Sequence, residues 1–341
     1  MKKLALTRLN EFFDAISADQ MLYMPLEKGG SVNYGVYAKG DKYDPTVLHT
    51  VKSVKDVFFP QCENMASFVT AGKKFEVAPV APVDQDFTVF GVRACDVRGM
   101  EALDKVFLSD PVDTYYAARR AHGTVISVVC NAPEETCFCT AFGIDPTNPG
   151  ADVEATIAGE DILFKPLTQK GEALLNKVAS LLTDADHSAA EATKASTKEI
   201  LKKLPLADID LSNWGEGKTH EMFDRPEWDE LCKSCLGCGT CTYVCPTCQC
   251  YDIRDYKVGD KTTRYRCWDS CMYSDFTMAA HGTNRPDKKQ RFRQRFMHKL
   301  VYFPDRYGMF SCVGCGRCVA KCPVSMNIVK VIKAMGGKNN E

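Results

Sequence analysis

The chain has 341 residues, of which 45% are hydrophobic and 26% charged, so it is expected to fold into more than one globular domain. Its 43 lysines and arginines balance 44 aspartates and glutamates, which gives no overall charge that favours nucleic acid. No stretch reaches the roughly 20 apolar residues that span a membrane. Near the N-terminus, Arg8, Glu11 and Asp14 interrupt the apolar residues, which indicates an amphipathic helix and not a signal peptide. These features predict a cytoplasmic protein.

Residues 1–205 have the pattern of an α/β domain. The apolar run 88–92 predicts a buried strand, and Asp96 is a candidate N-cap for the helix that follows it. A second unit has a helix through 115–120 and then a strand at 124–129. The two strands are expected to be neighbours in one sheet.

The apolar segments 153–157 and 162–164 flank a polar turn, which predicts a β-hairpin. Residues from about 183 to 205 are rich in small and polar side chains and are expected to mark a domain boundary, although an exposed helix could cross it. Residues 206–341 hold most of the cysteines. The predicted fold class is α+β, with an N-terminal α/β domain followed by a mainly helical C-terminal domain.

The chain contains 18 cysteines, and because the cytoplasm keeps thiols reduced, most of them are expected to be metal ligands and not disulfides. The spacing C-x2-C-x2-C-x3-C-P occurs twice. The first run is Cys235, Cys238, Cys241, Cys245 and Pro246, and the second run is Cys312, Cys315, Cys318, Cys322 and Pro323. Bacterial ferredoxins use this run, with three cysteines on one 4Fe-4S cluster and the fourth on the other.

Residues 206–341 are therefore predicted to form a ferredoxin-type domain with two 4Fe-4S clusters. Cluster 1 is expected on Cys235, Cys238, Cys241 and Cys322, and cluster 2 on Cys312, Cys315, Cys318 and Cys245. Structural zinc also uses C-x2-C pairs, but a zinc site takes four thiolates from two pairs and does not call for the repeated 2-2-3 spacing with a following proline.

The 246–311 segment between the runs is longer than a compact two-cluster ferredoxin requires and resembles helical ferredoxin domains. A helix is expected to start near Pro286 and to bury Phe292, Phe296 and Leu300. Its basic residues are expected on the outer side, where they form either a solvated face or a docking patch for an acidic partner. These residues are Lys288, Lys289, Arg291, Arg293, Arg295 and Lys299.

A third cluster site is expected in the N-terminal domain. Cys95 and Cys130 follow the two predicted strands, with Cys137 and Cys139 just beyond, and the carboxyl ends of parallel strands meet at one edge of a sheet. The alternative is a set of half-buried free cysteines. Because Cys137-Phe138-Cys139 lies in a turn-rich segment, a third 4Fe-4S cluster is favoured, with Asp96, Arg93 and Arg98 beside Cys95 placed to tune it.

The remaining cysteines are less informative. Cys248, Cys250, Cys267 and Cys271 lie close to the first run in sequence, and whether they bind metal is left open. Cys62 and Cys232 are expected to be free thiols.

The ordered set of motifs resembles the A-type subunits of anaerobic sulfite reductases and the beta subunits of soluble NiFe hydrogenase/sulfur reductase complexes. The resemblance covers residues from about 85 to 325 and is carried by these segments: Arg93-Ala94-Cys95-Asp96 with Leu103-Asp104, Cys130 through Cys139, Cys235 through Cys250, Ser270-Cys271-Met272, Ser274-Asp275-Phe276, His281-Gly282 and Cys312 through Cys318. Cys232 and Cys267 depart from the pattern. The resemblance implies one component of an anaerobic complex, which relays electrons between a flavin-containing subunit that oxidises NAD(P)H and a catalytic redox subunit.

The motifs of other redox proteins are absent from the sequence, since no G-x-G-x-x-G follows a strand and no P-loop or c-type haem motif occurs. An electron-transfer role is therefore favoured, and whether the chain is itself an enzyme is left open. The alternative is an enzyme that reduces a small sulfur oxyanion at the N-terminal cysteine site, with Arg93, Arg98, Arg119 or Arg120 as anion binders. A further alternative is an assembly scaffold with purely structural clusters.

Overall fold

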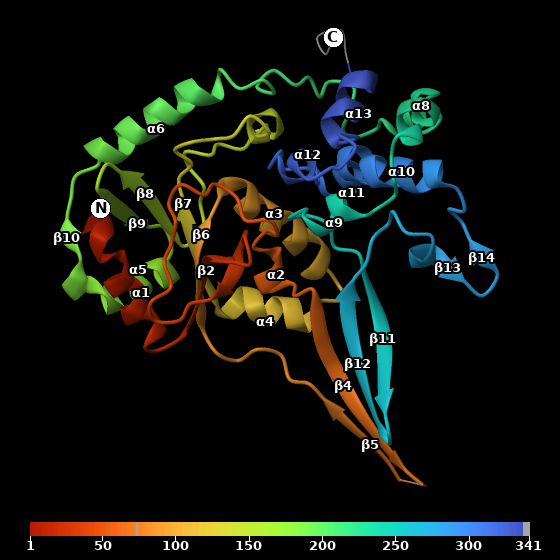
Figure 1. The fold of residues 1–341 in the computed structure, drawn as a ribbon, viewed down its shortest axis with the longest axis horizontal. Helices are drawn as coiled ribbons and strands as arrows, with labels where there is room; N and C mark the ends of the chain where they lie inside the picture. Colours follow the sequence, from red (N-terminus) through yellow and green to blue (C-terminus); the bar gives the residue numbers. More distant parts are fainter. Residues whose placement is uncertain (73, 337–341) are drawn as a thin grey trace.

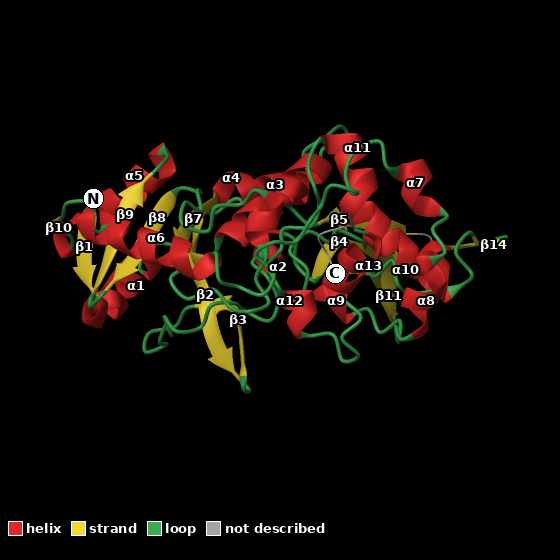
Figure 2. Ribbon diagram, turned by 90° about the horizontal axis from the view of Figure 1, so that it is seen from above, coloured by secondary structure: helices red, strands yellow, loops and turns green. Residues whose placement is uncertain are grey.

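The computed structural model describes residues 1–72 and 74–336. It has a sheet-containing N-terminal part and a helical C-terminal part, and a long four-stranded ribbon extends away from both (Figure 1). Figure 2 shows the two parts side by side from above. The predicted fold class is confirmed.

An eight-stranded mixed sheet forms the centre of the N-terminal part. In sheet order its strands are β10 (Thr183–Asp184), β1 (Lys2–Ala5), β9 (Asp161–Pro166), β8 (Val153–Ala158), β7 (Gly123–Val128), β6 (Phe87–Val92), β2 (Met21–Lys28) and β3 (Ser31–Val36). The four adjacent strands β8, β7, β6 and β2 are parallel, and the others pair antiparallel. The predicted β6–β7 pair and the β8–β9 hairpin are both present.

Helices cover both faces of this sheet, which explains why every residue of β6 is buried. The helices are α1 (Leu9–Ser17), α2 (Lys55–Phe58), α3 (Ala94–Phe107), α4 (Thr114–His122) and α5 (Gln169–Lys177). Phe90 points to the face covered by α1 and α5, and its neighbour Val89 points to the face covered by α2, α3 and α4. The first residues of the chain form strand β1, so the predicted N-terminal helix begins only at Leu9.

A second, four-stranded antiparallel sheet joins the two halves of the chain. Its order is β11 (Tyr251–Val258), β12 (Lys261–Trp268), β4 (Cys62–Ala71) and β5 (Lys74–Pro79). At its base, buried Arg266 pairs with Glu63 and Asp113, which ties β12 to β4 and to the start of α4. This hairpin between the two cysteine runs was not predicted.

The C-terminal part packs short helices around Trp228, Phe292, Phe296 and Ile332. Its elements are α7 (Thr219–Phe223), α8 (Glu227–Lys233), α9 (Thr240–Tyr243), the small strands β13 (Met278–Ala279) and β14 (Gly282–Thr283), α10 (Lys288–Met297), a π-helical turn (His298–Tyr302), α11 (Phe303–Tyr307), α12 (Arg317–Ala320) and α13 (Ile328–Met335). The expected helix is α10, which begins after a capping box at Asp287.

The expectation that all the basic residues of this helix lie on its outer side is wrong for two of them. Arg295 and Lys299 are only 2% and 3% exposed. They lie three residues after Phe292 and Phe296, so a period of 3.6 residues puts them on the buried side. The two cations therefore point towards the cysteine runs and cannot belong to a surface patch.

Helix α6 (Ser188–Leu201) occupies the segment that was expected to mark the domain boundary. Its Lys194 is buried and pairs with Glu154 of β8 at 2.7 Å, and its Thr197 hydroxyl donates to the carbonyl oxygen of Cys130 at 2.8 Å. The helix thus packs on the N-terminal sheet. Within the described residues, no helix is long and apolar enough to cross a membrane.

Candidate iron–sulfur site

The two cysteine runs form loops of the same shape. In each run a glycine with positive φ directly precedes a short helix, Gly239 (φ 73°) before α9 and Gly316 (φ 76°) before α12. A second glycine, Gly237 or Gly314, also has positive φ. Helices α9 and α12 pack against each other, so the two loops face one another. Glycine is needed here because the left-handed region is unfavourable for residues with a Cβ.

Cys245 of the first run lies with three cysteines of the second run. Together with Cys312, Cys315 and Cys318 it lines a small cavity, whose wall also contains Arg295 and Lys299. The hydrogen bond with Cys248 and the charge of Lys299 lower the pKa of Cys245 well below its usual value, although burial opposes this. The structure therefore brings together the four thiols predicted to hold cluster 2.

The cysteines predicted for cluster 1 are arranged more openly. Cys241 lies near Cys235 and also near Cys318 of the second run. Cys238 is exposed, and a hydrogen bond with Thr240 lowers its pKa. The Cys322 thiol lies 3.5 Å from the carbonyl oxygen of Met326. The assignment of Cys322 to cluster 1 stays a prediction.

Buried cations show that these cavities suit an anionic cofactor. The Nε and Nη1 atoms of Arg295 are buried without a hydrogen-bond partner, which is costly in a protein interior. Burial lowers the pKa of Arg295, but four nearby thiols together outweigh that effect and raise it; they are Cys241, Cys318, Cys248 and Cys245. The unpaired N–H groups thus lie among cluster cysteines, where the inorganic sulfides of a 4Fe-4S cluster would accept them.

The four cysteines of the expected third site are also brought together. Cys95 is the second residue of α3, Cys130 follows β7, and Cys137 and Cys139 lie in the loop after it. All four are buried. Burial raises the pKa of the Cys139 thiol, and nearby Cys130 and Cys137 raise it further. Thiolates in such a place need a cation beside them, which bound iron would supply.

His49 lies at this site although sequence reasoning did not predict it. Its Nε2 atom lies 3.9 Å from the Sγ atom of Cys95, and its Nδ1 atom lies 3.7 Å from a carboxylate oxygen of Glu134. Burial lowers the pKa of His49, which favours the neutral ring that binds metals. The long loop before α2 brings it to the site, and no sequence spacing connects it to Cys95.

The third set of cysteines abuts the second run. The backbone N–H of Phe138 donates to the carbonyl oxygen of Gly314 at 2.9 Å, and Cys95 and Cys139 both lie near Cys315. Burial and then the nearby carboxylate of Asp96, which was expected to help tune the third site, raise the pKa of Cys95. Asp96 also pairs with Arg317 of α12. The N-terminal part and the ferredoxin-type loops are therefore in direct contact.

Replacing Gly314 with alanine is expected to lower the free energy of unfolding by about 1–3 kcal/mol more than replacing Gly308 with alanine. Both glycines have positive φ, but a Cβ on Gly314 would lie 2.4 Å from the carbonyl oxygen of Phe138, whereas nothing lies within 4 Å of one on Gly308. Denaturant unfolding under anaerobic conditions measures the difference. Equal losses would show that the loops do not pack as closely as the structure describes.

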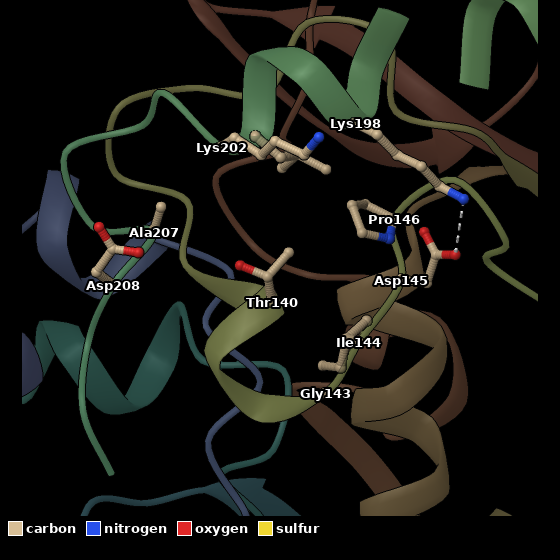
Figure 3. Close-up of a pocket in the computed structure, with 10 residues that line it drawn as sticks. Thr140, Gly143, Ile144, Asp145, Pro146, Lys198, Lys202, Ala207 and Asp208 are labelled. Carbon is tan, nitrogen blue, oxygen red and sulfur yellow. Dashed lines mark ion pairs between the residues drawn. The ribbon is translucent and has the colours of Figure 1, made fainter. Parts of the chain in front are cut away.

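A surface cavity of about 500 Å³ lies between α6 and the loop after Cys139. Figure 3 shows Lys198 of α6 pointing towards Asp145, whose carboxylate is 4.0 Å from its Nζ atom. Lys202, also at the cavity, pairs with Glu199. The cations of this cavity are thus already paired with carboxylates.

Comparison with known proteins agrees with this geometry. Residues 234–326 match the model of a 4Fe-4S dicluster domain. The chain is 31% identical to sulfhydrogenase 2 subunit beta of Pyrococcus furiosus over 334 residues, which cover 94% of each chain. No solved structure matches the chain. The resemblance to the beta subunits of soluble NiFe hydrogenase/sulfur reductase complexes is confirmed, and the chain belongs to the sulfhydrogenase beta-subunit family.

Proposed function

We propose that this chain is an electron-transfer subunit that relays electrons between a flavin-containing subunit that oxidises NAD(P)H and a catalytic redox subunit. Two 4Fe-4S clusters on the cysteine runs and a third on Cys95, Cys130, Cys137 and Cys139 would supply one-electron redox chemistry. The catalytic partner is a hydrogenase or a sulfite reductase. A cytoplasmic location and an anaerobic complex fit a chain in which all 18 cysteines are free thiols.

The observation that carries this proposal is that the cysteines of the three predicted clusters lie next to one another. Cys139 of the third set lies near Cys315 of the second, and Cys318 of the second lies near Cys241 of the first. The succession then ends at Cys238, which is exposed. Such an arrangement lets the chain hold clusters in a row from the N-terminal part to the surface.

The alternative enzyme that reduces a sulfur oxyanion lacks free anion binders. Arg93 donates to backbone carbonyl oxygens, and Arg98 pairs with Glu101. Arg119 and Arg120 pair with carboxylates of neighbouring elements, Glu63 and Asp104. Each of these arginines already has a partner within the protein, which makes it poorly placed to recognise an anionic substrate. The relay is therefore favoured.

The isolated chain is expected to accept electrons from dithionite but not from NADH or NADPH, because its fold shows cysteine sites and its sequence has no nicotinamide or flavin fingerprint. The absorbance of the clusters measures this directly. Addition of the flavoprotein subunit should confer reduction by NAD(P)H. Bleaching by NADH in the pure, flavin-free chain would contradict the relay, and clusters that no reductant bleaches would favour the scaffold.

A further inference from the structure

Three cysteines outside the predicted clusters meet at the base of the β11–β12 hairpin. Cys248 and Cys250 precede β11, and Cys271 follows β12. The pairing of Tyr251 with Trp268 closes the hairpin, and the N–H of Asp269 donates to the carbonyl oxygen of Cys250 at 3.0 Å. The hairpin therefore brings together cysteines that are 21 residues apart at its two ends.

The three thiols lie near one another. Cys250 and Cys271 each shift the pKa of the other, and Cys248 lies near both of them. Cys248 also lies near Cys245, and Cys271 lies near Cys241. The three thiols thus form a set of their own beside the first ferredoxin-type run.

Buried cations surround this set without carboxylate partners. Arg295, Lys299 and Lys55 are each 3% exposed or less. In the stretches 1–72 and 74–336, no carboxylate forms an ion pair with any of the three. Buried charges are tolerated when opposite charges accompany them, so the neighbouring sulfurs are the anions that remain.

The contacts of the two lysines point to the same conclusion. Lys55 Nζ donates to the carbonyl oxygen of Cys248 at 2.9 Å and lies 3.6 Å from the ring centre of Trp268. Lys299 Nζ donates to the Thr247 hydroxyl at 2.8 Å. Burial lowers the pKa of Lys55 to about 8, and the nearby thiols of Cys248 and Cys245 oppose that fall. Both cations are held where thiolates at the set would stabilise their charge.

The three thiols at this site determine which kind of cofactor it can bind. Three thiolates favour soft metals and iron–sulfur clusters over hard cations. Among the described residues, no group of three or more His, Cys, Asp or Glu side chains is arranged to hold a single metal ion.

We propose that Cys248, Cys250 and Cys271 bind three irons of an additional iron–sulfur cluster, whose fourth iron takes a ligand that is not a cysteine. Cys245 does not supply the fourth thiolate because it lines the cavity of Cys312, Cys315 and Cys318. The cluster adjoins Cys241, predicted for cluster 1, and Cys245, predicted for cluster 2, so it exchanges electrons with both clusters. This inference goes beyond the relay function, which can stand without it.

Iron and acid-labile sulfide analysis of the full chain tests the proposal. Cys250→Ser/Cys271→Ser is expected to lose about four irons per chain relative to the wild type. The control is Cys62→Ser/Cys267→Ser, which removes a cross-strand cysteine pair from the same sheet. The control should keep its full iron content.

A measurement on the wild-type chain tests the proposal even if the double cysteine variant does not fold. Mössbauer spectra of the 57Fe-enriched chain are expected to show one iron site with an oxygen or nitrogen ligand. Spectra in which every iron has four sulfur ligands, a Cys250→Ser/Cys271→Ser chain with unchanged iron, or stoichiometric zinc at the set would each overturn the proposal. The relay function would fail separately, through the NADH experiment.

Discussion

Replacing Arg317 with leucine is expected to lower the free energy of unfolding by about 3–5 kcal/mol, because it leaves the carboxylate of Asp96 buried without its partner. The two side chains form a bidentate pair, with N–O distances of 2.6 and 2.7 Å and exposed fractions of 3% and 1%. Arg317 Nε also donates to the carbonyl oxygen of Thr50 at 2.9 Å. Anaerobic denaturant unfolding of the full chain measures the loss.

Arg98→Leu is the matched control. Arg98 lies two residues after Asp96 on α3 and pairs with Glu101, but both side chains are more than 40% exposed. Exposed pairs of this kind contribute up to about 1 kcal/mol. The double variant Asp96→Leu/Arg317→Leu should recover part of the stability, since no unpaired charge remains. Equal losses for Arg317→Leu and Arg98→Leu would contradict the buried pairing.

Cys245→Ser is expected to remove the cluster predicted on Cys312, Cys315 and Cys318, with a loss of about four irons per chain. The reason is that the thiol lies in the cavity of the second run although it belongs to the first run in sequence. Iron analysis together with electron paramagnetic resonance of the reduced chain would show which cluster is lost.

Cys232→Ser provides the control for this variant. Cys232 is buried in the helical core, and its thiol lies 3.5 Å from the carbonyl oxygen of Asp229, so its loss should leave the iron content unchanged. If Cys245→Ser instead removed the cluster of Cys235, Cys238 and Cys241, the predicted exchange of the fourth ligand would be wrong.

The sequence predicted the features that depend on local patterns. The apolar run at β6 and the helix after it follow from periodicity, and the paired runs follow from cysteine spacing. The convergence of Cys95 and Cys130 follows from parallel strands, whose carboxyl ends share one edge of a sheet. These inferences need no knowledge of distant contacts.

Other features depend on contacts that sequence patterns do not reveal. The apolar–polar alternation of β11 is interrupted between Arg254 and Asp255, and most of its residues are exposed. Its partner β12 pairs with β4, about 200 residues earlier in the chain. A period of 3.6 residues from Phe292 and Phe296 would place Arg295 and Lys299 on the buried side, but the prediction followed their charge and placed them on the surface. Their burial is explained by the thiols of both runs, which lie close to the two positive charges.

The most direct test of the relay is electron paramagnetic resonance of the full chain, reduced stepwise under anaerobic conditions. Because the three predicted sets of thiols are contiguous, reduced clusters are expected to interact magnetically and to give broadened, split signals at full reduction. Cys137→Ser/Cys139→Ser should simplify that spectrum by removing the cluster that adjoins Cys315. Independent, unsplit signals in the wild type, or zinc in place of iron, would contradict the account.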